Sequence, residues 1–194
     1  MENKLYFFLR LIAKPLLKLL YRVEYVGLLN IPKEGRAILA GNHKSNYDCV
    51  YLMTSTNRMI NFVAKKELID GKFGWLFKKL GLIPVDRKKK NKQAIESAIN
   101  VLNNEGLIGI FPEGTFNQSE YKSLPFKMGA VKMAMETNSK IVPFAIQGDY
   151  KLFRKNVKII FGKPYKIKDK YDLRKENITL MNKVIKLLDN GNNE

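Results

Sequence analysis

The chain contains a single histidine, His43, and its position favours proton transfer. It follows the apolar segment 37–40 and Gly41, where a reversal of the chain can expose the ring. An unperturbed imidazole titrates near about pH 6.5, so this side chain is suited to general base catalysis at neutral pH. Asp48 comes five residues later, in the first turn of an expected helix. From there its carboxylate can reach one ring nitrogen, fix the tautomer and stabilise the imidazolium that forms.

A cysteine next to this pair raises an alternative, a Cys-His nucleophile. Cys49 falls within the apolar pattern of the expected helix, and a lone cysteine is more often a small buried hydrophobe. One Cys and one His form no disulfide framework, and a zinc site needs three or four such ligands. We therefore expect a reducing compartment, no metal and no cysteine nucleophile.

A His and an Asp five residues apart say little alone, but four sequence blocks accompany them in a fixed order. These blocks are Asn42 to Asp48 (NHKSNYD), Gly81 to Arg87 (GLIPVDR), Phe111 to Thr115 (FPEGT) and Ile141 to Phe144 (IVPF). Over residues 25–165 the chain thereby resembles the glycerophosphate acyltransferase family, specifically the bacterial 1-acylglycerol-3-phosphate acyltransferases. The resemblance implies that His43 is the catalytic base and Asp48 its orienting partner.

The resemblance also assigns the acceptor site. It implies that Arg87 and Glu113 bind the glycerol phosphate end of the acceptor, while Gly114 and Thr115 shape the loop. An arginine suits this role because its planar fork binds phosphate in a bidentate manner. Position 116 is Phe, where many relatives carry Arg or a similar polar residue. We expect Lys127 to supply charge instead, although a solvated lysine at the start of a helix is an equal alternative.

The implied reaction moves a fatty acyl group from a thioester of acyl carrier protein or coenzyme A to the 2-hydroxyl of lysophosphatidate. The acceptor provides the attacking oxygen, so no acyl-enzyme is needed. Backbone amides of a nearby loop would stabilise the oxyanion. No cofactor is expected, since the donor is a cosubstrate. Glycerol 3-phosphate or a lyso-aminolipid remains an alternative acceptor.

The chain is strongly basic, with 35 Lys and Arg against 18 Asp and Glu and a net charge of +17. Such a surplus indicates a polyanionic partner: nucleic acid, an anionic membrane or a phosphorylated substrate. Part of it reflects a composition rich in Lys, Asn and Ile. A basic nucleic-acid-binding module is the alternative from a different class, motivated also by the run 87–90. No helix-turn-helix, RNA-recognition or zinc-finger pattern is present, so we expect no nucleic acid.

Residues 1–22 are expected to form an amphipathic helix at a membrane surface. Its cations fall within an arc of about 120°, and the rest of the circumference is apolar; they are Lys4, Arg10, Lys14, Lys18 and Arg22. Such a helix suits the headgroup region of an anionic bilayer, although it can also pack on the domain. Pro15 is expected to bend it or split it in two. No apolar run is long enough to span a membrane, and no export signal is evident. We expect a peripheral protein on the cytoplasmic face of the cell membrane.

The remaining residues, 23–194, are expected to form one acyltransferase domain that positions these side chains. Short apolar segments alternate with segments of helical periodicity. We expect strands at 23–28, 37–40, 60–64, 82–85, 107–111, 141–146 and 157–161, and helices at 45–56, 73–80, 92–103, 127–137 and 174–189. This alternation predicts an α/β fold with a mostly parallel central sheet flanked by helices, and active groups in loops beyond the carboxyl ends of the strands.

Overall fold

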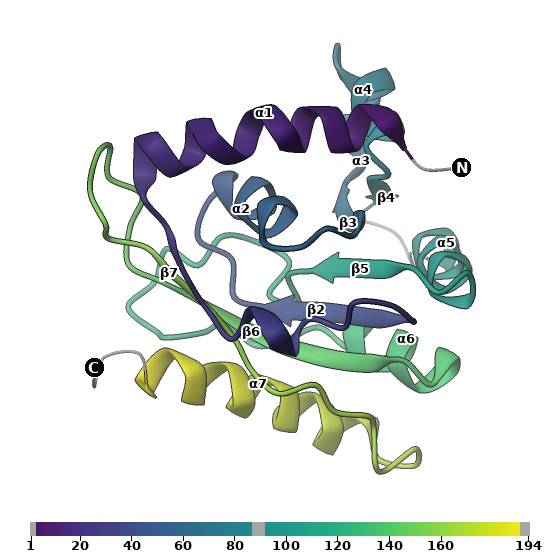
Figure 1. The fold of residues 1–194 in the computed structure, drawn as a ribbon. Coiled ribbons are helices and arrows are strands. Elements are labelled where there is room, and N and C mark those ends of the chain that lie inside the picture. The colour runs from purple at the N-terminus through teal and green to yellow at the C-terminus, as the bar shows by residue number, and fades with distance from the viewer. Residues whose placement is uncertain (1–2, 87–91, 191–194) are drawn as a thin grey trace.

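Seven strands form one sheet in the computed structural model, which describes residues 3–86 and 92–190 (Figure 1). The order is β1-β7-β6-β2-β5-β3-β4, and every neighbouring pair is parallel except β6 and β7. The strands are β1 (Glu24–Val26), β2 (Ala37–Gly41), β3 (Ile60–Lys65), β4 (Ile83–Val85), β5 (Leu107–Ile110), β6 (Lys140–Gln147) and β7 (Lys158–Phe161). The predicted mostly parallel sheet is therefore confirmed.

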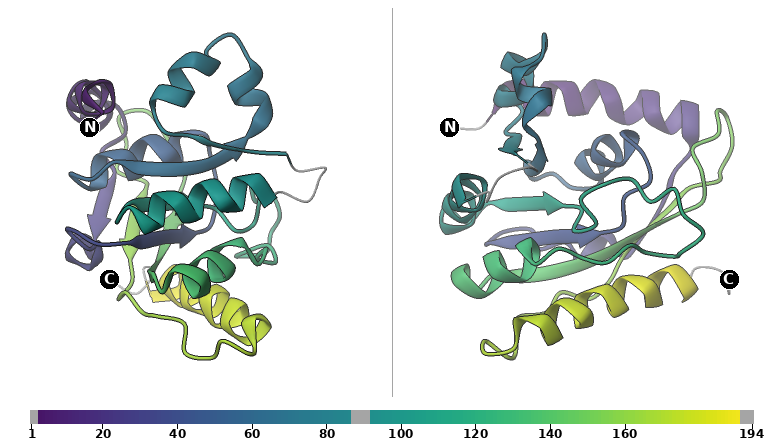
Figure 2. Two further views of the ribbon diagram at one scale, coloured as in Figure 1. Left: turned by 90° about the vertical axis from the view of Figure 1, so that its right-hand side faces the viewer. Right: turned by 180° about the vertical axis from the view of Figure 1, so that it is seen from behind.

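Helices cover both faces of the sheet, so the molecule has three layers (Figures 1 and 2). The helices are α1 (Lys4–Tyr21), α2 (Tyr47–Ser55), α3 (Lys66–Asp70), α4 (Gly74–Lys79), α5 (Lys92–Asn103), α6 (Gly129–Thr137) and α7 (Leu173–Asn190), with a 3-10 turn, η1 (Leu28–Asn30). One layer contains α1 and α2, and the layer on the other face contains α5, α6 and α7. The short helix α3 was not expected from the sequence.

The core is built on the central strand β2, whose five residues are all buried. Successive side chains of a strand point to opposite faces. Leu39 therefore packs in the cluster that contains Tyr51 of α2, whereas Ile38 packs in the cluster that contains Ala98 of α5 and Leu180 of α7. Burial on both faces explains why β2 is an uninterrupted apolar run, as is typical of a parallel strand between helices.

Helix α1 is docked on the domain by one side only. Tyr6 and Leu17 are buried, and the Tyr6 hydroxyl accepts a hydrogen bond of 3.0 Å from the amide of Ile60. Apolar side chains on the opposite side are half or more exposed: Phe8, Leu11, Ile12, Leu16 and Leu19. Docking on the domain is thus confirmed, and the described residues leave the broad apolar face that favoured a membrane uncovered.

The helix runs unbroken from Lys4 to Tyr21, so the expected division at Pro15 is wrong. Tyr6 and Leu17 are buried on either side of the proline and hold both halves of the helix to one surface. Tertiary packing of this kind offsets the local cost of proline inside a helix. Among the described residues, no helix is both long and apolar enough to cross a membrane.

Candidate active site

His43 lies just beyond the carboxyl end of β2, in the loop that leads to α2. The neighbouring parallel strand β5 ends at Ile110 and continues into the loop that begins Phe111 to Thr115. Because parallel strands end at the same edge of a sheet, the two loops meet there. The amide of Asn117 donates a hydrogen bond of 2.9 Å to the carbonyl of His43 and joins them. Two of the sequence blocks therefore form one site.

The expected dyad is present. His43 Nδ1 lies 2.8 Å from Asp48 Oδ2, and the Asp48 side chain is 0% exposed. The same oxygen accepts hydrogen bonds from the amides of Lys44 and Ser45 at 2.7 Å and 2.9 Å. These amides donate only, so the carboxylate is the acceptor, and His43 carries its hydrogen on Nδ1. In the neutral imidazole, the other ring nitrogen, Nε2, then has no hydrogen and can take a proton.

A third side chain, Tyr150, completes the surroundings of Asp48, and the sequence analysis missed it. Its hydroxyl donates a hydrogen bond of 2.7 Å to Asp48 Oδ1, and its ring stacks on Tyr51 with centroids 5.2 Å apart. Burial and the charge of Asp48 raise the pKa of Tyr150, so the hydroxyl remains a donor. The one signal in the sequence was its place shortly after a strand, at the edge where the other loops gather.

Two phenyl rings enclose the imidazole of His43, whose side chain is 13% exposed. Phe111 stacks on it with centroids 3.8 Å apart and planes 12° apart, and Phe116 lies at 4.4 Å and 56°. Phe116 is thus not a phosphate ligand but a wall of the site. An apolar enclosure of this kind limits the access of water to the ring.

Glu113 is the second acidic group at the site and is only 5% exposed. Among the described residues neither of its oxygens makes a hydrogen bond of normal geometry. Burial raises the pKa of Glu113 to about 7, although the nearby amides of Leu124 and His43 and the Ser123 hydroxyl favour its charged form. Such a buried, perturbed carboxyl is a common feature of functional sites.

The remaining predicted residues lie at the same loop, with one exception. Gly114 has φ of +72°, and a Cβ built on it would lie 2.7 Å from Lys127 Nζ, so the ammonium rests against this turn. Thr115 is exposed. Lys127 precedes α6, which begins at Gly129, and its amide donates to the carbonyl of Pro112; the expected helix start at 127 is therefore wrong. Arg87 lies outside the described residues.

Cys49 packs against the apolar core, and burial raises the pKa of its thiol to about 12. A thiol that stays protonated at neutral pH is a poor nucleophile. No three His, Cys, Asp or Glu side chains gather as metal ligands anywhere in residues 3–86 and 92–190.

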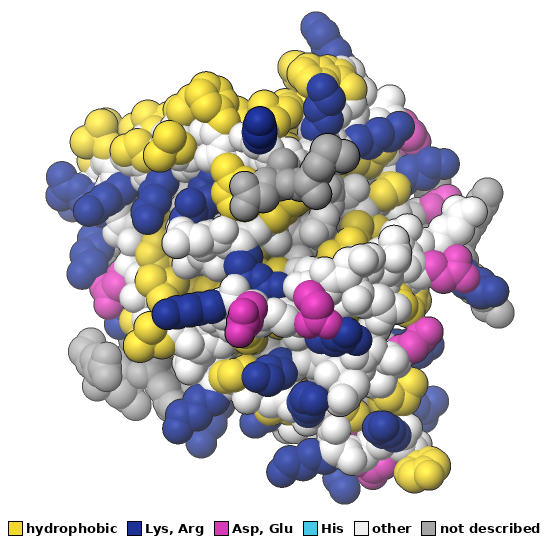
Figure 3. Space-filling model, turned by 45° about the vertical axis from the view of Figure 1, so that its right-hand side comes forward, with side chains coloured by type: hydrophobic (Ala, Val, Ile, Leu, Met, Phe, Trp, Pro, Cys, Tyr) yellow, Lys and Arg dark blue, Asp and Glu magenta, His cyan; other side chains and the backbone are white. Residues whose placement is uncertain are grey.

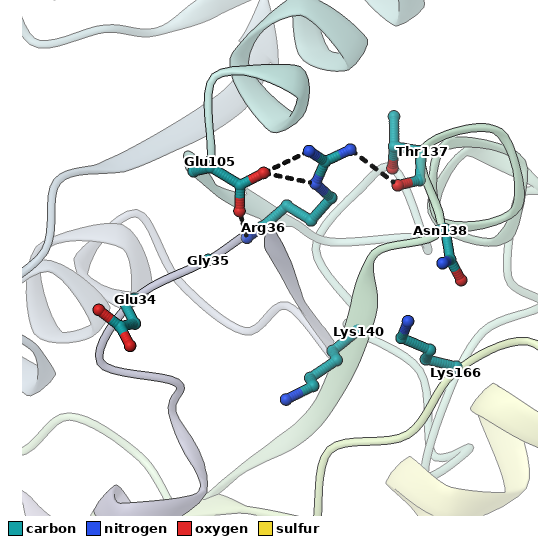
Figure 4. Close-up of a pocket in the computed structure, with 8 residues that line it drawn as sticks. All are labelled: Glu34, Gly35, Arg36, Glu105, Thr137, Asn138, Lys140 and Lys166. Carbon is teal, nitrogen blue, oxygen red and sulfur yellow. Dashed lines mark hydrogen bonds and ion pairs between the residues drawn. The ribbon is translucent and has the colours of Figure 1, made fainter.

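Two cavities lie at opposite ends of the strands. One, of about 270 Å³, includes Arg36, Glu105 and Lys140, which lie at the amino ends of β2, β5 and β6 (Figure 4). There the Arg36 guanidinium pairs with Glu105. This ion pair lies at the opposite end of the strands from His43 and Asp48. The other, of about 420 Å³, is lined by Asn42 and Lys44, the two neighbours of His43. The second cavity therefore borders the candidate active site.

Comparison with known proteins identifies the family of this chain. A family model described as Acyltransferase matches residues 22–147. The 1-acyl-sn-glycerol-3-phosphate acyltransferase of Bacillus subtilis (strain 168) is 32% identical over 157 residues, which cover 78% of this chain and 77% of that protein. The chain belongs to the acyltransferase family. The family match contains His43, Asp48, Glu113 and Lys127 of this acyltransferase, whereas Tyr150 lies beyond it.

Two further proteins resemble this acyltransferase. The 1-acyl-sn-glycerol-3-phosphate acyltransferase of Streptococcus pneumoniae (strain ATCC BAA-255 / R6) is 32% identical, with 76% of this chain and 57% of that protein covered. The crystal structure of the 1-acyl-sn-glycerophosphate (LPA) acyltransferase PlsC from Thermotoga maritima superposes with a TM-score of 0.77 at 22% identity and covers 95% of this chain and 79% of that one. The structural match supports the fold.

Proposed function

We propose that this acyltransferase moves a fatty acyl group from an activated thioester to the 2-hydroxyl of 1-acylglycerol 3-phosphate, forming phosphatidate for phospholipid synthesis. The names of the similar proteins support this acceptor. The observation that carries the chemistry is the 2.8 Å contact between His43 Nδ1 and Asp48, which leaves Nε2 as the base. The donor is a thioester of acyl carrier protein or coenzyme A, used as a cosubstrate with no further cofactor.

In the proposed reaction, the acceptor hydroxyl attacks the thioester carbonyl while Nε2 of His43 takes the hydroxyl proton. Asp48 stabilises the imidazolium that results. The tetrahedral intermediate then collapses, the carbon–sulfur bond breaks, and the imidazolium returns the proton to the leaving sulfur. Backbone amides of the surrounding loops would stabilise the oxyanion. Each step is a transfer between substrates, so no residue of the chain is acylated.

The acceptor phosphate carries close to two negative charges and needs cations near the dyad. We assign this role to Arg87, from its sequence block, and to Lys127, whose ammonium rests against Gly114. Glu113 would accept hydrogen bonds from the glycerol end of the acceptor, since neither of its oxygens makes a hydrogen bond of normal geometry to another described residue. Thr115, exposed beside it, and Gly114 would shape the loop that receives the phosphate.

We also propose that α1 holds the enzyme at the cytoplasmic face of the cell membrane as a peripheral protein. The acceptor and product are lipids, and α1 turns its exposed apolar side chains away from the domain. Lys14 and Lys18 lie beside these side chains on the same helix and suit the headgroups of an anionic bilayer. An acidic acyl carrier protein would also suit this basic chain.

The proposed activity is tested with purified protein, labelled lysophosphatidate and each thioester donor in turn. Product formation should fall by about 10² to 10⁴ in His43→Ala, the range for loss of a general base. Circular dichroism checks that the variant is folded. Near wild-type turnover in His43→Ala would refute the assignment, and acylation of glycerol 3-phosphate in preference to lysophosphatidate would show that the acceptor is wrong.

A further inference from the structure

The hairpin formed by α3 and α4 exposes large apolar side chains that no described part of the chain covers. Leu68 is 45%, Phe73 57% and Trp75 60% exposed. The hairpin itself is firmly held. Ile69 is buried beneath it, and a Cβ built on Gly74 would lie 1.7 Å from the carbonyl oxygen of Ile69, so the two helices meet backbone to backbone. The outward side chains therefore extend from a closely packed pair of helices.

Cations surround these apolar side chains. Residues 65–79 contain five lysines against two carboxylates, and all seven are exposed; they are Lys65, Lys66, Lys72, Lys78 and Lys79, with Glu67 and Asp70. The ammonium of Lys79 lies 5.6 Å from the ring centroid of Trp75. Apolar and aromatic side chains amid lysines are the composition of surfaces that enter anionic membranes, where tryptophan favours the interface.

The hairpin also continues the exposed face of α1. The side chain of Asn3, the N-cap of α1, donates a hydrogen bond to the carbonyl of Lys79 at the end of α4. Both elements lie on the same side of the molecule, above α2 and the sheet (Figures 1 and 2). Hydrophobic side chains gather along this edge of the molecule, where α1 and α4 lie, and Lys and Arg side chains lie below this edge and, near α4, also among and above it (Figure 3).

We propose that the α3–α4 hairpin is a second membrane contact, whose Leu68, Phe73 and Trp75 enter an anionic bilayer while its lysines meet the headgroups. This inference rests on the proposed membrane function of α1 and adds a contact beyond that helix. Helix α1 alone would contact the bilayer along a line. The hairpin adds a contact to one side of that line, next to the hydrogen bond between Asn3 and Lys79, so the two contacts together define a plane. The bilayer would therefore fix the rotation of the enzyme about the axis of α1, and with it the direction in which the site faces the lipid.

Trp75 is the only tryptophan of the chain, so its fluorescence reports this hairpin alone. The full-length protein is mixed with vesicles of phosphatidylcholine and phosphatidylglycerol, and binding is measured in parallel by sedimentation. We expect emission to shift to shorter wavelength, and lipids brominated on the acyl chain to quench it. Protein that sediments with unchanged, unquenched emission would refute the hairpin contact while leaving α1 as an anchor. Protein that does not sediment would refute both.

A double substitution on the hairpin, with a single substitution elsewhere as the control, provides a second test. Leu68→Gln with Phe73→Gln should weaken vesicle affinity roughly tenfold, because each side chain is about half exposed and the two together lose about the burial of one whole side chain. Leu29→Gln replaces a leucine that is 94% exposed on η1, away from this face, and should leave affinity within about twofold of wild type. Equal affinity of the two variants would overturn the proposal, as would a shift of Trp75 emission by acidic acyl carrier protein but not by vesicles.

Discussion

Replacing Glu113 with Gln should stabilise the protein at alkaline pH and much less at acidic pH. Burial raises the pKa of Glu113 from 4.5 to about 7 in the folded chain. Between these two values the folded state holds a proton that the unfolded state has lost, so stability falls as pH rises from 4.5 towards 7. Above pH 7 both states are ionised, and the full cost of the buried charge remains. At about 1.4 kcal/mol for each unit of pKa, this cost is about 3 kcal/mol.

Glutamine has the same shape and does not ionise, so the variant lacks this pH-dependent cost. Urea unfolding at about pH 5 and about pH 8.5 should show a stability gain that is about 2 to 3 kcal/mol larger at the higher pH. Any loss of packing or hydrogen bonding in the variant is common to both conditions and cancels. Glu120→Gln, at an exposed position of the same loop, is the control. If the free energy of unfolding of the variant differed from that of the wild type by the same amount at both pH values, Glu113 would titrate as a solvated carboxyl and the reasoning would be refuted.

Three further predictions concern catalysis and membrane binding. Tyr150→Phe should lower kcat about 10- to 100-fold at unchanged acceptor KM, because a hydrogen bond to a charged group is worth roughly 1.5 to 3 kcal/mol, whereas the exposed Tyr171→Phe should have no effect. Arg87→Ala should raise the acceptor KM strongly, and a fall in kcat alone would contradict a role in phosphate binding. Replacing Lys14 and Lys18 with Glu should weaken binding to anionic vesicles more at low salt than at high salt, since each cation contributes about 1 kcal/mol.

Deleting residues 1–22 is a less informative test of membrane binding. Tyr6 and Leu17 are buried, and the ring of Tyr21 lies 6.0 Å from that of Tyr150, which holds Asp48. The truncated chain would lose part of its core and a neighbour of the dyad together with its anchor. Substitutions at the exposed face of α1 separate these effects.

The sequence predicted most of the sheet from local patterns, and it predicted the pairing of His43 with Asp48 because the four sequence blocks resemble those of a known family. Apolar segments such as 37–40 identify buried strands, and the spacing of His43 and Asp48 lies within one loop and one helical turn. Strand direction is not local: the antiparallel pairing of β7 with β6 depends on the course of the chain between them. Helix α3, five residues long, is too short for its periodicity to be recognised.

Contacts between distant residues were the other part that the sequence did not reveal. Tyr150 lies 102 residues from Asp48, and a tyrosine that bonds to a carboxylate has no distinctive spacing. The raised pKa of Glu113 could not be predicted from the sequence either, because it depends on burial by several loops at once. Phe116 was noted only as a missing cation, whereas packing makes it a wall beside His43.

Pro15 sets a limit on the depth to which α1 can sink in lipid. Proline has no amide hydrogen, so the carbonyl of Leu11 lacks the hydrogen bond that the residue four positions later normally donates in a helix. Leu11 belongs to the exposed face of α1. A carbonyl without a donor is costly in hydrocarbon, but water among the headgroups can satisfy it. The helix should therefore settle where its leucines reach the acyl chains and this carbonyl remains hydrated, whereas Pro15→Ala would let it sit deeper in the same bilayer.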